Sequence, residues 1–275
     1  MLYQKFLKIK HLLAGKIFQS KTLRSLEKQC EEGFWIAQAF RNVLHRKNSP
    51  DAYKHLKPLE KYREALLLDK SPISFDEIGS DQTLTVANIA QRAASPRQWS
   101  LFFYELSKVK KVKNILEIGT NLGVSGQYFI KGLEGKKDTK FTTIEGVKGL
   151  CEIAEKQFGR LSTPEGYEVI HGLYDQALKQ IVRKDSTFDL IFLDGNHQYQ
   201  ATLNYFEWLK NKLTRRAVVI FDDIHWSPGM QKAWREASTQ QGVVFSIDFF
   251  KLGVVVFDTQ RKLPPESHYK LFLSV

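Results

Sequence analysis

Two rhythms of apolar residues divide the chain. Up to about residue 110, apolar side chains recur mostly at spacings of three and four, which predicts amphipathic helices. From Val112 onward, short runs rich in β-branched and aromatic residues alternate with helical stretches. The runs predict five strands: Asn114–Ile118, Phe141–Glu145, Tyr167–His171, Phe188–Asp194 and Ala217–Asp222.

This alternation predicts a mostly parallel sheet, because each return to a parallel strand needs a helical crossover. Two later runs, Val243–Phe250 and Leu252–Phe257, are separated by Lys251 alone. So short a gap joins two strands only as an antiparallel hairpin. The expected fold is a Rossmann-like, doubly wound α/β domain with a mostly parallel seven-stranded sheet and a C-terminal antiparallel hairpin.

The predicted domain organisation has two parts. Residues 95–275 form the α/β domain, and residues 1–94 form a helical N-terminal extension or cap. Prolines and glycines between residues 48 and 81 indicate loops around one short helix within this extension. A length of 275 residues fits one large domain with an appended piece.

Composition narrows the class of protein. With 43% hydrophobic and 26% charged residues, the chain is typical of globular proteins and not of disordered ones. Two cysteines, Cys30 and Cys151, exclude a disulfide scaffold. No apolar run approaches the roughly 18 residues that span a bilayer, and lysines interrupt the N-terminal apolar residues, unlike in a signal peptide. The expected location is the cytoplasm.

Positive charge is concentrated at the N-terminus. The formal net charge is +11, and residues 1–50 hold 10 lysines and arginines against 3 acids. Two roles stay open for the first helix: docking on its own domain or on a second copy as a homodimer, and peripheral contact with a membrane surface or nucleic acid. Its predicted apolar stripe consists of Leu2, Phe6, Ile9, Leu13 and Ile17.

The loop after the first predicted strand is rich in glycine. It reads Glu117-Ile118-Gly119-Thr120-Asn121-Leu122-Gly123-Val124-Ser125, which matches neither the G-x-G-x-x-G dinucleotide fingerprint nor a P-loop. Glycines allow a sharp turn and close approach of a ligand. An acid two residues before the first glycine suits a cationic, phosphate-free ligand better than a pyrophosphate.

This E-x-G-x-x-x-G pattern resembles the first motif of class I S-adenosylmethionine-dependent methyltransferases. The resemblance implies that Glu145, at the end of the second strand, binds the ribose hydroxyls. It also implies that the third strand end faces the adenine, with Leu173 where an acid is common and Asp175 as a substitute or a helix start. The predicted cofactor-binding residues are Glu117, Gly119, Thr120, Asn121, Gly123, Ser125, Glu145, Gly146, Gly172, Leu173 and Asp194.

Acidic residues end the fourth and fifth strands. Asp194 follows one buried run and Asp222-Asp223 follow the next. Adjacent parallel strands lie about 4.8 Å apart, so we expect these carboxylates to converge. Crowded carboxylates repel one another unless a cation or a proton lies between them. Oxygen ligands alone suit Mg²⁺, Mn²⁺ or Ca²⁺, and an added His197 or His225 would admit a transition metal.

The pattern L-D-G-N-H-x-Y followed by D-D resembles methyltransferase family 24 and, more distantly, the cation-dependent catechol and caffeoyl-coenzyme A O-methyltransferases. The resemblance covers residues 95–275. It implies that Asp194, Asp222 and Asp223 bind a metal or the substrate, and that Asp194 and His197 are catalytic. His197 stands where those enzymes carry a lysine general base, and the alternative role for it is a hydrogen bond that orients Asp194.

The predicted function is therefore S-adenosylmethionine-dependent methylation of an oxygen atom on a small-molecule or glycan acceptor, with assistance from Mg²⁺ or another divalent cation left open. One alternative is a nucleic-acid methyltransferase, which the net charge favours. Asp-Gly-Asn-His after the fourth strand argues against it, since amino-methylating DNA enzymes use Asn/Asp-Pro-Pro-Tyr/Phe there. The other alternative is a non-catalytic S-adenosylmethionine-binding scaffold.

Overall fold

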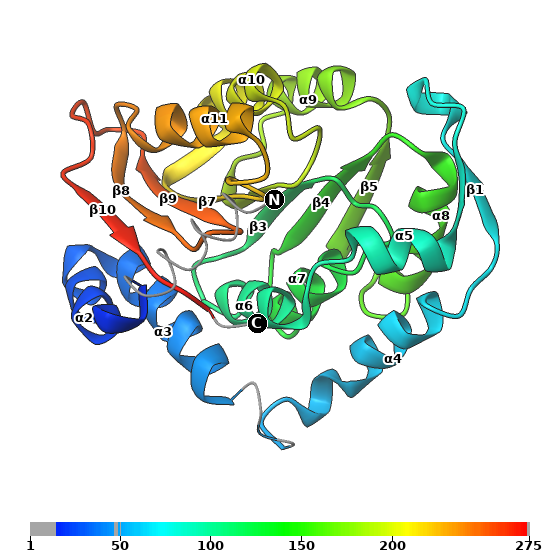
Figure 1. Cartoon of the computed structure of the whole chain (residues 1–275), viewed down its shortest axis with the longest axis horizontal. Helices are drawn as coiled ribbons and strands as arrows, with labels where there is room; N and C mark the ends of the chain where they lie inside the picture. The colour runs from blue at the N-terminus through cyan, green and yellow to red at the C-terminus, as the bar shows by residue number, and fades with distance from the viewer. Residues whose placement is uncertain (1–14, 47–48, 50, 274–275) are drawn as a thin grey trace. The chain divides into compact units, whose positions relative to one another are not determined.

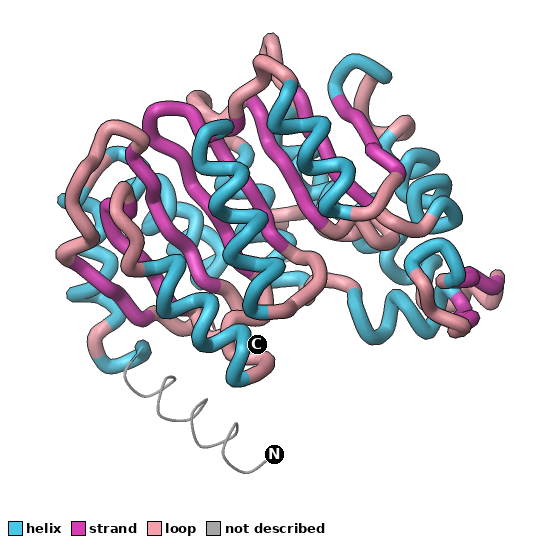
Figure 2. Tube along the Cα trace, turned by 90° about the horizontal axis from the view of Figure 1, so that it is seen from above, coloured by secondary structure: helices cyan, strands magenta, loops and turns pink. Residues whose placement is uncertain are grey.

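A computed structural model describes residues 15–46, 49 and 51–273. The chain divides into two compact units. The central unit consists of residues 41–181, and the C-terminal unit consists of residues 1–40 together with 182–275. Figure 2 shows helices and strands alternating along much of the chain, as expected for crossover connections. The predicted domain boundary after residue 94 stays a prediction.

The central unit contains three parallel sheet strands in the order β3-β4-β5, drawn in green in Figure 1. The register pairs Ile118 with Ile144 and Glu145 with His171, so the carboxyl ends of the three strands lie side by side. The strands are β3 (Asn114–Ile118), β4 (Lys140–Glu145) and β5 (Tyr167–His171), and the helices are α4 (Lys57–Leu66), α5 (Val86–Ala93), α6 (Arg97–Ser107), α7 (Gly126–Leu133) and α8 (Lys148–Phe158).

A row of buried phenylalanines holds these helices to the strands. Phe103 of α6 stacks on Phe129 of α7 with ring centroids 5.0 Å apart, and Phe129 lies 5.8 Å from Phe141 of β4. Phe141 in turn meets Phe158 of α8 edge-on. Each buried side chain of this size contributes about 1.5–3 kcal/mol, and the ring geometry adds to that. The strand ends are therefore carried on a rigid base.

The C-terminal unit holds five sheet strands in the order β10-β8-β9-β7-β6. β6 and β7 are parallel, while β9 pairs antiparallel with both β7 and β8. The predicted antiparallel hairpin is thus confirmed. The strands are β6 (Phe188–Leu193), β7 (Leu213–Phe221), β8 (Val243–Asp248), β9 (Gly253–Asp258) and β10 (Ser267–Lys270), and the helices are α2 (Gln19–Gln29), α10 (Tyr199–Leu209) and α11 (Pro228–Ser238).

Helices α3 (Glu31–Arg46) and α9 (Tyr174–Arg183) contain the boundaries between the units. The mostly parallel α/β architecture with N-terminal helices is confirmed. The strand count is wrong, because the larger sheet contains eight strands among the described residues, three in one unit and five in the other, where the sequence predicts seven. The additional strand, β10, was missed because it has four residues, Ser-His-Tyr-Lys, without an apolar run.

A short two-stranded antiparallel sheet lies in the segment predicted to be loops. β1 (Pro72–Ser74) and β2 (Thr83–Thr85) pair through three residues each, too few to produce a readable alternation. Between them lies the one-turn helix η2 (Asp76–Ile78). We call residues 72–85 the β1–β2 arm.

The basic N-terminal stripe falls mostly outside the described residues, which begin at Gly15. Ile17, its last member, is exposed. Within the described ranges, no helix is both long enough and apolar enough to cross a membrane.

Candidate functional site

The glycine loop of the central unit turns back on the end of β4. Gly119 and Gly123 have φ values of 100° and 71°, a region that glycine enters without steric cost, and Asn121 joins them at 47°. The backbone N–H groups of Gly119 and Thr120 both donate to the Ile144 carbonyl, at 3.0 and 3.1 Å. The spacing of the two glycines therefore serves a loop whose backbone is fixed against the neighbouring strand.

Glu117 is completely buried beneath this loop. Its Oε1 accepts a hydrogen bond from the Ser125 hydroxyl at 2.5 Å, and its Oε2 accepts one from the Thr143 hydroxyl at 2.9 Å. Thr120 extends the network through a 2.7 Å contact between its hydroxyl and that of Thr143. Burial raises the pKa of Glu117 to about 8, against the two hydroxyl hydrogen bonds, which lower it. Glu117 thus ties the two ends of the loop together.

Glu145, at the end of β4, is the acid next to the glycine loop. Its Oε2 accepts from the Asn121 N–H at 2.8 Å, and its Oε1 accepts from the Val147 N–H at 3.0 Å. Burial raises the pKa of Glu145, and these backbone donors oppose the rise. Each carboxylate oxygen accepts about two hydrogen bonds, so a carboxylate fixed this way retains capacity for ligand hydroxyls. The predicted pairing of the glycine loop with Glu145 is present in the structure.

The third strand end presents an exposed surface. Leu173, which follows β5, is 45% exposed, and Gly172 leaves the strand with its N–H bonded to the Glu145 carbonyl at 2.9 Å. The His171 Nε2 atom lies 3.2 Å from the Gly146 carbonyl oxygen. The predicted cofactor residues of the second and third strands, Glu145, Gly146, Gly172 and Leu173, therefore cluster in the central unit.

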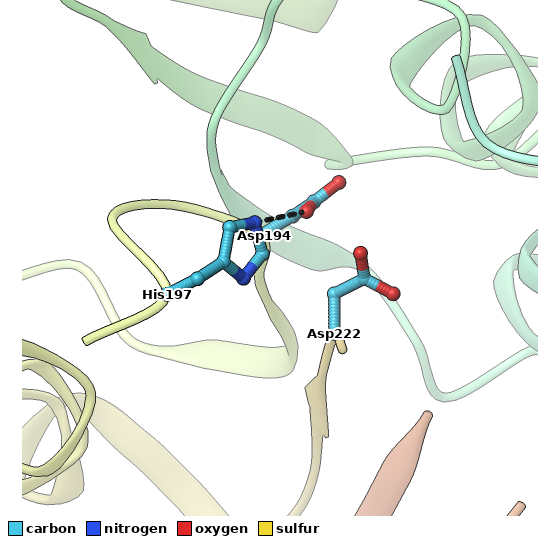
Figure 3. Close-up of side chains that lie close together, drawn as sticks. All are labelled: Asp194, His197 and Asp222. Atoms are coloured by element: carbon cyan, nitrogen blue, oxygen red, sulfur yellow. Dashed lines mark ion pairs between the residues drawn. The ribbon is translucent and has the colours of Figure 1, made fainter. Parts of the chain in front are cut away.

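The C-terminal unit brings three of the predicted chemical groups together. Asp194 follows β6, His197 lies in the loop after it, and Asp222 follows β7, next to Leu193, whose carbonyl accepts the Asp222 N–H at 2.9 Å. One ligand atom from each of Asp194, His197 and Asp222 lies within 4.8 Å of the others. Figure 3 shows the His197 ring against the Asp194 carboxylate, with Nε2 and Oδ1 3.5 Å apart, and the Asp222 carboxylate beside them.

The backbone of these loops is strained at His197 and at two residues adjacent to the group of three. Asn196, His197 and Asp223 have positive φ values of 67°, 39° and 50°. Conformations of this kind cost of order 1–3 kcal/mol each and cluster at functional sites. The short turn brings the imidazole back toward Asp194, three residues earlier.

Asp223 was predicted as a metal ligand but lies outside this group of three. Its Oδ1 instead accepts from the Lys251 ammonium at 2.8 Å, and the same ammonium donates to Asp222 Oδ2 at 2.9 Å. Burial lowers the pKa of Lys251, but the charges of Asp222 and Asp223 outweigh burial and raise it. Lys251 is therefore a permanent cation between two of the three acids.

Sequence reasoning missed Lys251, although the predicted hairpin contained a signal. β7 pairs antiparallel with β9, and Phe221 faces Gly253 in the register. The turn that precedes Gly253 consequently lies at the end of β7, next to Asp222 and Asp223. Predicting this would have required knowing that β9, and not β8, is the neighbour of β7.

The donor set fits a divalent cation. Two carboxylates and an imidazole can bind a metal of the borderline class, and carboxylates are the ligands that Mg²⁺ and Mn²⁺ prefer. Asp222 Oδ1 is buried and has no hydrogen-bond partner within the described part of the chain, which leaves a buried acceptor oxygen for an ion. The Lys251 ammonium on the other oxygen reduces, without cancelling, the negative charge of the group.

Three aromatic residues that follow these strands in the sequence, Tyr199, Trp226 and Trp234, occupy different environments. Trp234 is buried against Phe221 as part of the core. Tyr199 is half-buried and donates to Glu236 at 2.7 Å. Trp226, by contrast, is 73% exposed in the loop after Asp223, whose carbonyl accepts its N–H. Of the three, Trp226 alone presents most of its ring to solvent.

Comparisons with known proteins show similarity to methyltransferases. Residues 116–224 match the family model of a methyltransferase domain, family 24, which confirms the resemblance predicted from the sequence. A catechol O-methyltransferase of Niastella koreensis is 26% identical over 147 residues, which cover 53% of this chain and 64% of that protein. The chain thus spans less than two thirds of this relative's length.

Solved structures share the fold. An O-methyltransferase of Bacillus cereus in complex with S-adenosylhomocysteine superposes with a TM-score of 0.54 at 22% identity, over 72% of this chain and 90% of that one. The O-methyltransferase TomG of Streptomyces achromogenes, in complex with S-adenosylmethionine, superposes with a TM-score of 0.50 at 21% identity, over 60% and 82% of the two chains.

Proposed function

We propose that the protein, whose residues 116–224 match the model of a methyltransferase domain, transfers the methyl group of S-adenosylmethionine to a hydroxyl oxygen of a small-molecule or glycan acceptor. The observation that carries the proposal is the arrangement of Glu145 and the left-handed glycine loop around the Asn121 N–H. Two neighbouring carboxylate oxygens suit the two vicinal hydroxyls of a ribose. The Niastella koreensis relative is named as an enzyme that acts on a catechol, an oxygen acceptor.

The central unit would bind the nucleoside part of the cofactor. Glu145 accepts the ribose hydroxyls, while Gly119 and Gly123 keep side chains away from the path of the ligand. Glu117 shapes the loop from below through Ser125 and Thr143. Internal hydrogen bonds fix the backbone of the loop, and a preorganised loop lowers the ordering cost of binding.

The C-terminal unit would supply the acid–base chemistry. In a direct displacement the acceptor oxygen attacks the methyl carbon as the carbon–sulfur bond breaks, and the hydroxyl proton must leave. His197 is the proposed acceptor of that proton, because an imidazole exchanges protons near neutral pH. Asp194, 3.5 Å from its Nε2 atom, would stabilise the imidazolium that forms. Proton transfer of this kind contributes roughly 10²–10⁴-fold to the rate.

Asp194 and Asp222 would hold the divalent cation, with Asp223 and Lys251 next to them, which leaves the imidazole of His197 to accept the proton. A divalent cation there lowers the cost of deprotonating a hydroxyl. Loss of the cation would therefore reduce turnover more than it would reduce cofactor binding.

The test combines calorimetry with an activity assay. Titration with S-adenosylmethionine should give saturable one-to-one binding, and radiolabelled methyl should then pass to a hydroxyl acceptor in a panel of sugars and catechols. Turnover should fall on adding EDTA and return with Mg²⁺. Absence of cofactor binding would overturn the proposal. Binding without transfer to any hydroxyl acceptor would favour a scaffold, and transfer to RNA alone would favour the nucleic-acid alternative.

A further inference from the structure

The β1–β2 arm is anchored in the core of the central unit. Ile73 of β1 is buried in an apolar cluster that includes Val147 and Leu150, at the start of α8. Its Cδ1 atom lies 3.1 Å from the position that a Cβ on Gly149 would occupy. The base of the arm is therefore packed against the segment that follows the end of β4.

The tip of the arm is held by polar contacts. Glu77, in the one-turn helix η2, accepts a hydrogen bond from the Lys148 N–H at 2.6 Å. Its Oε2 also lies 3.6 Å from His171 Nε2, at the end of β5. These contacts fix the tip across the carboxyl ends of β4 and β5, beside Glu145.

This anchoring brings Ile78 directly onto Gly146. A Cβ on Gly146 would lie 2.7 Å from Ile78 Cγ2 and 3.9 Å from Leu173 Cδ2. Yet both Ile78 and Leu173 are 45% exposed. Gly146 is thus flanked by two apolar side chains that retain free surface, immediately after the acid that ends β4.

We propose that Ile78 packs against the purine ring of the cofactor next to Gly146, together with Leu173, which the resemblance already implies lies near the adenine, so that the arm forms part of the nucleoside site; we call this apolar contact the clamp. The inference rests on the proposed function. The base and the 2′-hydroxyl are attached to adjacent carbons of the ribose, so a ribose whose hydroxyls bind Glu145 carries its base within a few bonds of Gly146. The faces of a purine are flat and apolar, and Ile78 and Leu173 offer them apolar contact.

Glu77 acts as a positioning residue in this arrangement. It does not contact the purine but holds Ile78 in place through Lys148 and His171. Replacing it should weaken nucleoside binding less than replacing Ile78 itself, because Ile73 still anchors the arm.

The test compares Ile78→Ser with Leu68→Ser in the full chain. Leu68, 80% exposed in the same unit, provides a matched loss of an exposed apolar side chain. Calorimetry with S-adenosylhomocysteine should show the dissociation constant of Ile78→Ser raised roughly tenfold, because the purine loses the apolar contact that the half-exposed Ile78 side chain provides. Leu68→Ser should match the wild type.

Adenosine serves as the second probe. Its affinity should fall by a similar factor in Ile78→Ser, because the clamp acts on the base and not on the amino-acid part of the cofactor. Hydrogen exchange of residues 75–82 should also slow when S-adenosylhomocysteine binds to the wild type. Equal affinities of Ile78→Ser and Leu68→Ser, with the wild type binding normally, would overturn the clamp alone. A wild type that does not bind S-adenosylhomocysteine would overturn the proposed function and the clamp together.

Discussion

The carboxylates around the two candidate sites, one in each unit, are satisfied in opposite ways. In the central unit, Glu117 and Glu145 accept hydrogen bonds from neutral groups, two hydroxyls and two backbone N–H groups. In the C-terminal unit, Asp222 and Asp223 share the ammonium of Lys251, and Asp194 faces His197.

This difference separates two tasks. Neutral donors fix the position of a carboxylate without adding charge, which suits recognition of uncharged hydroxyls. Charged or titratable partners neutralise a carboxylate with a proton or a cation, either of which can exchange. Such an arrangement suits a reaction in which a proton is transferred. The comparison predicts that substitutions in the central unit change cofactor binding, whereas substitutions in the C-terminal acid group change turnover.

The largest expected effect follows from Asp222→Asn. The variant removes a charge from the group that holds the proposed cation, so turnover should fall at least about 100-fold. Its affinity for S-adenosylmethionine should stay within about twofold of the wild type by calorimetry, because its hydrogen bonds lie outside the nucleoside site. Asp185→Asn, an exposed acid in the same unit, should leave both quantities unchanged. Turnover within tenfold of the wild type would contradict the division of tasks.

Glu145→Gln should affect binding first. The amide cannot accept from both Asn121 and Val147 and still bind two hydroxyls, and hydrogen bonds to a charged group are worth about 1.5–3 kcal/mol. Affinity for S-adenosylmethionine should therefore fall roughly 10- to 100-fold. Glu168→Gln, on the neighbouring strand and paired with Lys140, is the control. If both variants bind equally well, Glu145 has no role in the cofactor site.

Glu117→Gln should change the pH dependence of stability. Because burial raises the pKa of Glu117 to about 8 from 4.5, the folded chain keeps a proton that the unfolded chain releases. Stability contributed by the neutral carboxyl is present below about pH 4.5 and is lost as pH rises toward 8, by at most about 1.4 kcal/mol per pH unit. Urea unfolding between pH 5 and pH 8 should give a flatter profile for the variant. Parallel profiles would mean that Glu117 ionises normally in the fold.

The smallest expected effect is that of Lys251→Met. Removing the ammonium leaves Asp222 and Asp223 to repel each other, so Tm should fall by about 2–4 °C, as for a loss of about 1 kcal/mol. Millimolar Mg²⁺ should raise Tm more in this variant than in the wild type, since the ion then replaces the missing cation. Lys232→Met, exposed on α11, should show neither change. A Mg²⁺ response equal to that of the wild type would argue against a cation site at Asp222.

Local patterns predicted most of the sheet. β3 and β5 begin and end at the predicted residues, because each is a short run with β-forming residues at its centre, bounded by charged or turn-forming residues. Strand β10 could not be predicted from the sequence, since its alternation of half-buried and exposed positions depends on pairing with β8. The β1–β2 arm was missed for the same reason, because three-residue strands follow from tertiary contacts and not from periodicity.

The candidate site was predictable only where strands that are consecutive in the sequence are also neighbours in the sheet. Glu145 and the glycine loop follow from the β3–β4 pairing, and Asp194 and Asp222 from the β6–β7 pairing. Lys251 lies in the turn between β8 and β9, and Ile78 lies in the β1–β2 arm. Both are distant in sequence from the strand ends beside which they lie, so no local motif predicts their positions. Whether Asp223 joins the ligands despite its contact with Lys251 stays a prediction.

The ammonium of Lys251 also determines the net charge of the acidic group around it. Asp194, Asp222 and Asp223 carry three negative charges, and one lysine leaves two. A single ion of valence two neutralises this remainder, whereas Na⁺ or K⁺ would leave one negative charge. Lys251 would in this way determine the charge of the cation that the acidic cluster prefers, without itself binding that cation.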